Sequence, residues 1–259
     1  MMYLNKALAQ RMESCFKHTH RDMALPGSIL DIAGGAACFA GPDSFFTQVI
    51  AWGFATKAKH FQSQIHAIEQ FYQSLAHSRV DIELCPFVGN ELAVLLSQRG
   101  YEISELSQVS FLNLNEYQPT LCSSAFEVRE VAVVEFENWS NKVAVGFGYL
   151  EAQDQFSRYI DRDGVCVFAA YDKGHIVAGA TMAVHDDIGD LGVSSTLPAY
   201  RGLGVQKHLL RARLNQAKEQ GLALAMVTTE PGSISDLNVQ KVGFRVGYTR
   251  IKMTKTFLR

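Results

Sequence analysis

A glycine-containing turn between an apolar run and a helical pattern is the feature that most constrains this chain. The turn reads Leu-Pro-Ala-Tyr-Arg-Gly-Leu-Gly-Val-Gln-Lys-His over residues 197–208. Residues 191–197 predict a strand, and the residues after the turn carry apolar side chains at helical spacing. Glycine adopts backbone conformations closed to other residues, so Gly202 and Gly204 permit a tight strand-to-helix connection.

Such a turn has a chemical consequence, because the first N–H groups of a helix lack intrahelical partners. The aligned peptide dipoles add roughly half a positive charge at the same end. A glycine-rich turn that opens a helix is therefore suited to binding phosphate, and Arg201 would add a full positive charge at its mouth. The string lacks the third glycine of a dinucleotide fingerprint and the Gly-Lys-Ser/Thr of a Walker loop.

The string Pro-x-x-Arg-Gly-x-Gly-x-x-x-x-Leu-Leu resembles the acyl-CoA pyrophosphate loop of the GNAT superfamily of N-acetyltransferases, whose pattern is Arg/Gln-x-x-Gly-x-Gly/Ala. Arg201 and Gly204 match this pattern, whereas Gln206 occupies the last small-residue position and should narrow the loop. The resemblance implies a cofactor-binding segment made of Arg201, Gly202, Leu203, Gly204, Val205, Gln206 and Lys207, with the amides of 203–207 holding the pyrophosphate.

Composition excludes several other classes of protein. The chain has 259 residues, of which 47% are hydrophobic and 19% charged, so a sizeable core is expected. A formal net charge of −2 argues against a nucleic-acid partner. The five cysteines are scattered and the first residues lack a signal-peptide pattern, so we expect no zinc, no disulfide framework and a cytoplasmic location. No apolar run is long enough for a membrane span, and we interpret His18 and His20 as solvated helix-end side chains.

The predicted elements of the second half follow the GNAT plan over residues 125–259. They are strand 126–133, helices 135–147 and 151–159, strands 165–171, 175–184 and 191–197, the helix after the loop to 221, strand 222–229, a short helix from Ser233 to Gly243, and strand 244–257. Asn238 and the Gly243-Phe244 pair match the closing element of the family. Many members have a tyrosine where this chain has Val239, so the step that protonates the departing thiolate is in doubt.

The first half repeats part of this order. Its predicted elements are helix 3–23, a strand pair in 29–40, strand 45–54, helix 61–75, strand 80–86, helix 91–98 and strand 101–114, followed by a polar linker, 114–125. Residues 89–101 and 232–244 share one Gly–helix–Gly–aromatic spacing. We therefore predict an α/β (α+β) fold of two GNAT-like units, each a mixed, mostly antiparallel twisted sheet flanked by helices, although generic α/β alternation is an alternative.

The domain division predicted from this repeat is 1–122 for a degenerate N-terminal unit and 123–259 for the acyl-CoA-binding unit. Residues 57–61, Lys-Ala-Lys-His-Phe, stand where the first unit would need a glycine-rich loop. Without glycines the backbone cannot close around a pyrophosphate, so we expect the first unit to act as scaffold and substrate wall.

The family resemblance also suggests how the other site residues act. Strands 191–197 and 222–229 would splay apart, and the main chain of Ser195, Thr196 and Leu197 would bond the pantetheine arm. Asn238 would bond a pantetheine amide or cap local backbone. For the proton taken from the amine we favour Glu230, with a solvated turn residue as the equal alternative. Tyr248 could replace the missing acid or be a core tyrosine.

These inferences lead to two functional hypotheses from different classes. The first is an N-acetyltransferase that moves acetyl from acetyl-CoA, its co-substrate, to a primary amine of a small molecule or peptide by direct attack in a ternary complex. The second is a non-catalytic acyl-CoA-binding sensor or interaction module, which Val239 favours. A purely structural protein would bind no CoA. No metal or membrane is required, a homodimer is allowed, and the acceptor is left open.

Overall fold

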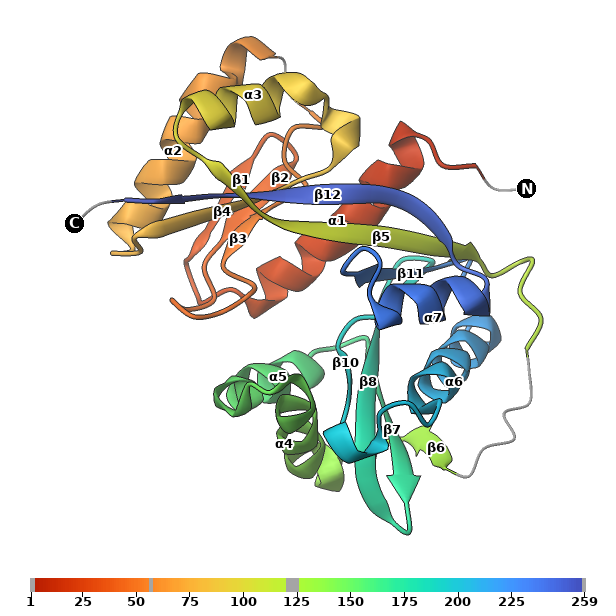
Figure 1. The fold of residues 1–259 in the computed structure, drawn as a ribbon. Helices are drawn as coiled ribbons and strands as arrows, with labels where there is room; N and C mark the ends of the chain where they lie inside the picture. The colour runs from red at the N-terminus through yellow and green to blue at the C-terminus, as the bar shows by residue number, and fades with distance from the viewer. Residues whose placement is uncertain (1–2, 56–57, 120–125, 258–259) are drawn as a thin grey trace. The chain divides into compact units, whose positions relative to one another are not determined.

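The computed structural model describes residues 3–55, 58–119 and 126–257, which form a mixed α/β fold (Figure 1). They fall into two compact units, one made of the chain up to 109 together with the residues from 247 onward, and one made of 110–246. The predicted boundary at 122/123 lies outside the described residues, as do Cys122 and Lys57.

In the first unit, the part of the chain that the structure describes forms three α-helices and a set of strands. Its elements are α1 (Lys6–Met23), β1 (Ile29–Ile32), β2 (Gly35–Cys38), β3 (Gln48–Ile50), η1 (Ala58–His60), α2 (Phe61–Ser74), β4 (Arg79–Leu84), η2 (Pro86–Val88), α3 (Asn90–Gln98), most of β5 (Glu102–Asn113) and most of β12 (Arg245–Thr256). The strand order is β1-β2-β3-β4-β12-β5. β3 pairs with β4 in parallel, and β12 runs antiparallel to β4 from Ile251–Leu84 to Thr256–Arg79.

Alternation along the strands of the first unit assigns its helices to opposite faces. Val49 and Ile82 join a core with residues of α2 and α3. Gln48, one residue away, instead contacts His20 of α1 through a 2.7 Å bond between the two side chains. Because successive strand residues point to opposite faces, α1 covers one side and α2 with α3 the other.

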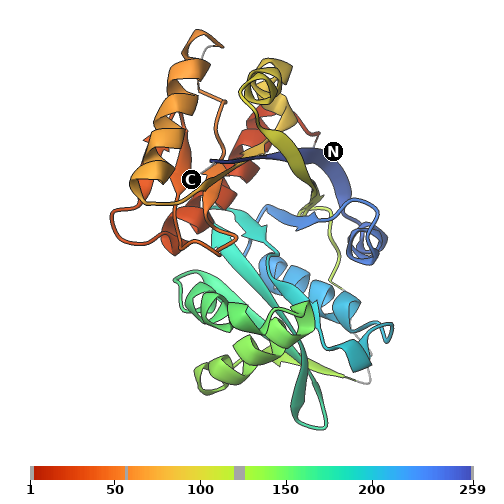
Figure 2. The same ribbon diagram turned by 60° about the vertical axis from the view of Figure 1, so that its left-hand side comes forward.

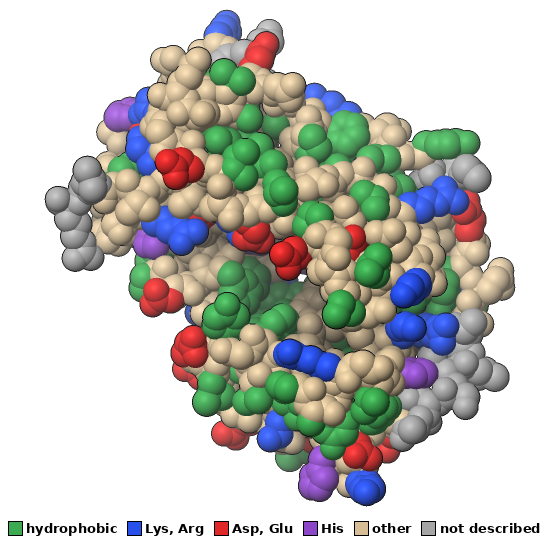
Figure 3. All heavy atoms as spheres, viewed as in Figure 1, with side chains coloured by type: hydrophobic (Ala, Val, Ile, Leu, Met, Phe, Trp, Pro, Cys, Tyr) green, Lys and Arg blue, Asp and Glu red, His purple; other side chains and the backbone are tan. Residues whose placement is uncertain are grey.

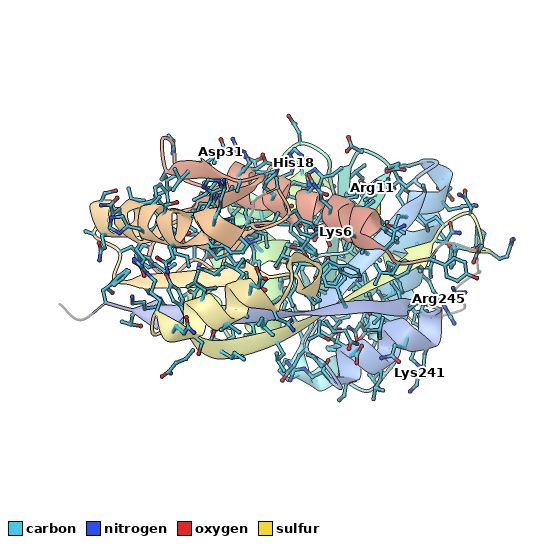
Figure 4. The ribbon with its side chains drawn as sticks, turned by 90° about the horizontal axis from the view of Figure 1, so that it is seen from above. Lys6, Arg11, His18, Asp31, Lys241 and Arg245 are labelled. Atoms are coloured by element: carbon cyan, nitrogen blue, oxygen red, sulfur yellow. The ribbon has the colours of Figure 1, made fainter. Side chains whose placement is uncertain are left out.

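α1 is amphipathic in the way its sequence predicts. Lys6, Arg11 and His18 lie on its exposed side (Figure 4), whereas residues such as Met12 are fully buried. His20 differs from our expectation of a solvated side chain: it is buried, and one ring nitrogen lies 2.7 Å from the Phe16 carbonyl. Within the described ranges, no group of three or more His, Cys, Asp or Glu side chains could hold a metal ion, and no helix has the length and apolar character to cross a membrane.

The described residues of the second unit form four α-helices around a second set of strands (Figures 1 and 2). Its elements are the end of β5, β6 (Glu127–Glu130), η3 (Val133–Glu135), α4 (Phe136–Phe147), η4 (Leu150–Ala152), α5 (Gln153–Ile160), β7 (Val165–Asp172), β8 (His175–His185), β9 (Ile188–Asp190), β10 (Ser194–Thr196), η5 (Pro198–Tyr200), α6 (Val205–Glu219), β11 (Leu224–Thr229) and α7 (Ile234–Val242). The strand order is β5-β11-β9-β8-β7-β6, and β10 pairs separately with β8.

Small residues of β8 let helices approach both of its faces. Ala178 and Ala180 pack in the core that contains the buried side of α6. On the opposite face, a Cβ added to Gly179 would lie 2.5 Å from Val143 and 2.6 Å from Trp139, both of α4. β8 is therefore covered by α6 on one side and by α4 on the other, as Figures 1 and 2 show.

Two strand predictions are corrected by the observed pairing. Of the strand expected over 191–197, only Ser194–Thr196 is a strand, β10, and a further short strand, β9, precedes the predicted range at Ile188–Asp190. β9 pairs in parallel with β11, but β10 returns to β8, so the extended run breaks around Gly192. Likewise, only residues 48–50 of the strand predicted over 45–54 pair with neighbours.

The predicted repeat is confirmed in the order of elements. β3–α2–β4–α3–β5 of the first half corresponds to β10–α6–β11–α7–β12 of the second half. The observed units nevertheless differ from a single cut in the sequence, because most of β12 belongs to the first unit while residues 110–113 of β5 belong to the second. β12, the last strand of the second half, therefore lies mostly in the first unit, and the end of β5, the last strand of the first half, lies in the second unit.

Candidate functional site

The predicted phosphate loop lines a trough in the second unit. The trough encloses about 530 Å³ and is formed by the end of α4, by β10, by the loop, and by the first turns of α6 and α7. Its lining residues are Gly146, Phe147, Ser194, Ser195, Thr196, Tyr200, Arg201, Gly202, Gly204, Val205, Gln206, Lys207, Ile234, Ser235 and Asn238. None of these described residues is acidic, so the trough suits an anionic ligand.

The two loop glycines have the backbone conformation that the sequence predicted for them. Gly202 and Gly204 have φ of +78° and +79°, and, chain neighbours aside, no heavy atom of the described residues lies within 4 Å of a Cβ built on either. Gly204 is the N-cap of α6 and has no side chain that could accept from the first amides of the helix. The Lys207 amide, which we expected to hold the pyrophosphate, already donates to the Gly204 carbonyl at 3.0 Å, so in this first turn the amides of Val205 and Gln206 are the ones left for a ligand.

Arg201 acts differently from the free positive charge that we expected at the mouth. Its Nη2 donates to the Gly146 carbonyl at 2.8 Å, and its Nε donates to the Thr196 carbonyl at 3.3 Å. The guanidinium thus joins the end of α4 to β10, and it positions the loop as well as adding charge. Lys207, in the first turn of α6, contributes a second positive charge to the lining.

The register of β10 determines which of its amides could bind a ligand. The Leu197 amide donates to Val177 of β8 at 3.0 Å, and the Val193 carbonyl accepts from the Thr181 amide at 2.9 Å. In an antiparallel pair, alternate residues turn their main-chain groups away from the partner strand. Ser194 and Thr196 therefore present the outward amides, whereas the main-chain groups of Ser195 and Leu197, which we expected to bond pantetheine, face β8.

The side chains of the other predicted residues divide into structural and exposed groups. Ser195 is buried and its hydroxyl donates to the Val143 carbonyl of α4 at 2.9 Å. Val205 points into the core, so only its amide can reach a ligand. Leu203 is exposed and does not line the trough, which again leaves only its main chain.

Gln206 and Asn238 meet across the trough. The Asn238 Nδ2 donates to Gln206 Oε1 at 2.7 Å, and the Gln206 Nε2 donates to Ser235 Oγ at 2.7 Å. The larger residue at the last position of the loop pattern therefore reaches α7 instead of closing the loop. Ser235 was missed at the sequence level, because its alignment with Gln206 depends on how α6 and α7 pack.

The two residues predicted for proton transfer lie in different units. Glu230 is exposed and follows β11, whose last three residues extend beyond the pairing with β9. Tyr248 belongs to the first unit, where its hydroxyl donates to Glu13 Oε1 at 2.6 Å. Burial raises the pKa of Tyr248 far above its usual range, so this phenol keeps its proton. Val239, at the position of the family tyrosine, is fully buried in the core.

Three buried polar side chains, Asp190, Tyr159 and Arg213, lie near the point where β9 and β10 diverge, and we did not predict them as a group. Asp190 ends β9, and a Cβ added to Gly192 would lie 2.9 Å from the Tyr159 hydroxyl. Burial and then the Asp190 charge raise the pKa of Tyr159 to about 12. Burial lowers the pKa of Arg213 to about 10, and its Nη1 donates to the Thr181 carbonyl at 2.9 Å.

The wall at the end of α4 was also missed. Gly146 and Phe147 line the trough, and a Cβ on Gly146 would lie 2.5 Å from Ser195 Oγ. Tyr200 donates its hydroxyl to Asp172 at 3.2 Å and lines the trough beside the loop. A signal that could have found this wall is the Gly-Phe-Gly run at 146–148, at the end of the predicted helix 135–147.

Comparison with known proteins agrees with this geometry. Residues 130–244 match the family model described as the acetyltransferase (GNAT) family. The structure also resembles a GCN5-related N-acetyltransferase from Kribbella flavida, with a TM-score of 0.76 and 16% identity over 96% of this chain and 95% of that one. A GCN5-related N-acetyltransferase from Sphaerobacter thermophilus gives 0.64 and 16% identity, over 80% of this chain and 71% of the other.

A tandem GNAT protein from the clavulanic acid biosynthesis pathway has a TM-score of 0.57 and 10% identity, and the match covers 97% of this chain and 94% of that protein. No curated protein matches the sequence. The fold and the loop thus define an α/β protein that contains an acetyltransferase-type domain. Residues 130–244 form a GNAT domain, and the fold of the whole chain resembles that of a tandem GNAT protein.

Proposed function

We propose that the second unit transfers an acetyl group from acetyl-CoA to a primary amine by direct attack in a ternary complex. One observation carries the proposal: the uncapped start of α6 opens, through two glycines with positive φ, into a trough without acidic lining. This arrangement fits the diphosphate of coenzyme A, because amide donors and a helix N-terminus stabilise phosphate oxygens.

The remaining lining residues fit the rest of that substrate. The outward amides of Ser194 and Thr196 would bond the pantetheine arm along the free edge of β10, and one of them would meet the thioester oxygen. A hydrogen-bond donor directed at an oxygen that becomes anionic in the transition state lowers the activation free energy by about 3–4 kcal/mol. Asn238 would contact a pantetheine amide from α7.

The reaction forms a bond between the amine nitrogen and the acetyl carbon and breaks the carbon–sulfur bond. The amine loses a proton and the sulfur gains one. We assign the removal of the amine proton to the exposed carboxylate of Glu230, directly or through water. Tyr248 has no role in this scheme, because its hydroxyl is bonded to the buried Glu13.

Two measurements test the proposal. We expect calorimetry to detect CoA binding, and we expect free CoA thiol to appear when acetyl-CoA is mixed with an active member of a panel of primary amines. Absence of binding would refute the proposal. Tight binding without thiol release across a broad panel would support the second candidate, a non-catalytic acyl-CoA sensor, which the burial of Val239 in the core favours.

A further inference from the structure

Gln206 organises hydrogen-bonding groups on two helices. Its side-chain amide extends from the first turn of α6 to α7, with contacts of 2.7 Å to both Ser235 and Asn238. All three side chains are half-buried and line the trough. The GNAT pattern has a small residue at this position, so this three-residue connection departs from the pattern.

The connection has a defined polarity. An amide nitrogen can only donate, so the Ser235 oxygen accepts from Gln206 and its own hydroxyl proton is left for another acceptor. Asn238 gives an N–H to Gln206, so its carbonyl oxygen is left as an acceptor. Gln206 therefore fixes one donor, on Ser235, and one acceptor, on Asn238, at the trough surface.

The ends of α6 and α7 differ in a way that separates their roles. Ser233 caps α7, because its hydroxyl accepts from the Asp236 amide at 3.1 Å. The N-cap of α6 is a glycine without such a side chain, so the amides of Val205 and Gln206 are left for a ligand. The side chains of α7 that line the trough include Ser235, in its first turn, and Asn238, one turn further along.

We propose that Gln206 is a positioning residue for coenzyme A, which presents the Ser235 hydroxyl to an oxygen of the diphosphate and the Asn238 carbonyl to an N–H of the pantetheine arm. Phosphate oxygens only accept at neutral pH, and pantetheine amides offer N–H donors, so both ends of the connection match this ligand. The inference rests on the proposed function, since it assumes that CoA occupies the trough.

The test uses calorimetry of the full chain with two ligands, CoA and pantetheine, which lacks the phosphates. Ser235→Ala and Gln206→Ala are each expected to raise the Kd of CoA about tenfold. The variant that combines Ser235→Ala and Gln206→Ala should have a Kd for CoA no higher than the higher of the two single-variant values, because both substitutions remove the same connection. Ser235→Ala should leave the Kd of pantetheine unchanged. Gln216→Ala, the same residue type on α6 outside the trough, is the matched control and should bind CoA like wild type.

Gln206→Glu separates ligand positioning from a purely structural link between the helices. Glutamate would accept from both partners, draw the Ser235 proton away from the ligand and place a negative charge beside the diphosphate. It should therefore weaken CoA binding more than Gln206→Ala does. If wild type binds CoA but Ser235→Ala and Gln206→Ala stay within twofold of it, the positioning role is overturned and the proposed function stands. If wild type binds no CoA, both fail. Ser235→Ala keeps the test decisive should the Gln206 variants not fold.

Discussion

Alanine variants of Gly204 and Gly221, compared side by side, should distinguish an effect on stability from an effect on ligand binding. The two glycines flank the same helix, α6, and have φ of +79° and +75°. No heavy atom lies within 4 Å of a Cβ built on either residue. Alanine at either position therefore meets backbone strain without a steric clash.

The expected loss of stability is the same for both variants. An L-residue in the left-handed region costs about 1–2 kcal/mol, and the stiffer unfolded chain offsets about 0.4–1 kcal/mol of this. The net destabilisation should be about 1 kcal/mol, which lowers Tm by about 2–4 °C for a chain of this size. Thermal or urea unfolding of Gly204→Ala and Gly221→Ala measures this value directly.

The expected effect on binding differs between the two ends of the helix. Relief of strain at Gly204 turns the first amides of α6, and each hydrogen bond lost to a charged phosphate oxygen costs about 1.5–3 kcal/mol. The Kd of CoA should therefore rise about 10–100-fold for Gly204→Ala and stay within twofold for Gly221→Ala. Calorimetry in which both variants bind CoA as wild type does, although both are destabilised, would refute the role given to the loop amides.

Three further outcomes follow from particular contacts. Gly179→Ala should destabilise the second unit by about 1–3 kcal/mol in urea unfolding, because its Cβ would lie 2.6 Å from Trp139; a neutral effect would show that α4 can shift freely. Gly146→Ala should raise the KM for acetyl-CoA several-fold, because its Cβ would displace Ser195 and with it β10; an unchanged KM would mean that β10 does not contact the substrate. Burial raises the pKa of Glu13, so the folded state binds the Glu13 proton more tightly than the unfolded state does, and the free energy of unfolding falls as pH rises through that pKa. Between pH 4 and 9, the free energy of unfolding of Glu13→Gln should therefore fall less steeply than that of wild type. Parallel curves for the two proteins would contradict this.

Much of the fold could be read from the sequence because the signals involved are local. The amphipathic pattern of α1, the glycine stop at Gly243 and the serine cap at Ser233 each depend on neighbouring residues, and the structure has all three. The strand-to-helix turn at Gly202 and Gly204 belongs to the same group, since the ability to adopt a positive φ is intrinsic to glycine, and both residues use it here.

The chain by itself determined the phosphate loop, the helix that follows it and the order of the repeated elements. Only the tertiary structure decided that β10 leaves β11 for β8, that β12 joins the first unit and that Tyr248 bonds Glu13. Strand partners and the targets of long side chains are chosen by packing between distant segments. A pattern of neighbouring residues does not specify which distant segment it will pack against. The positions of Ser194, Ser235 and the other residues that line the trough therefore depend on how the helices and strands pack together.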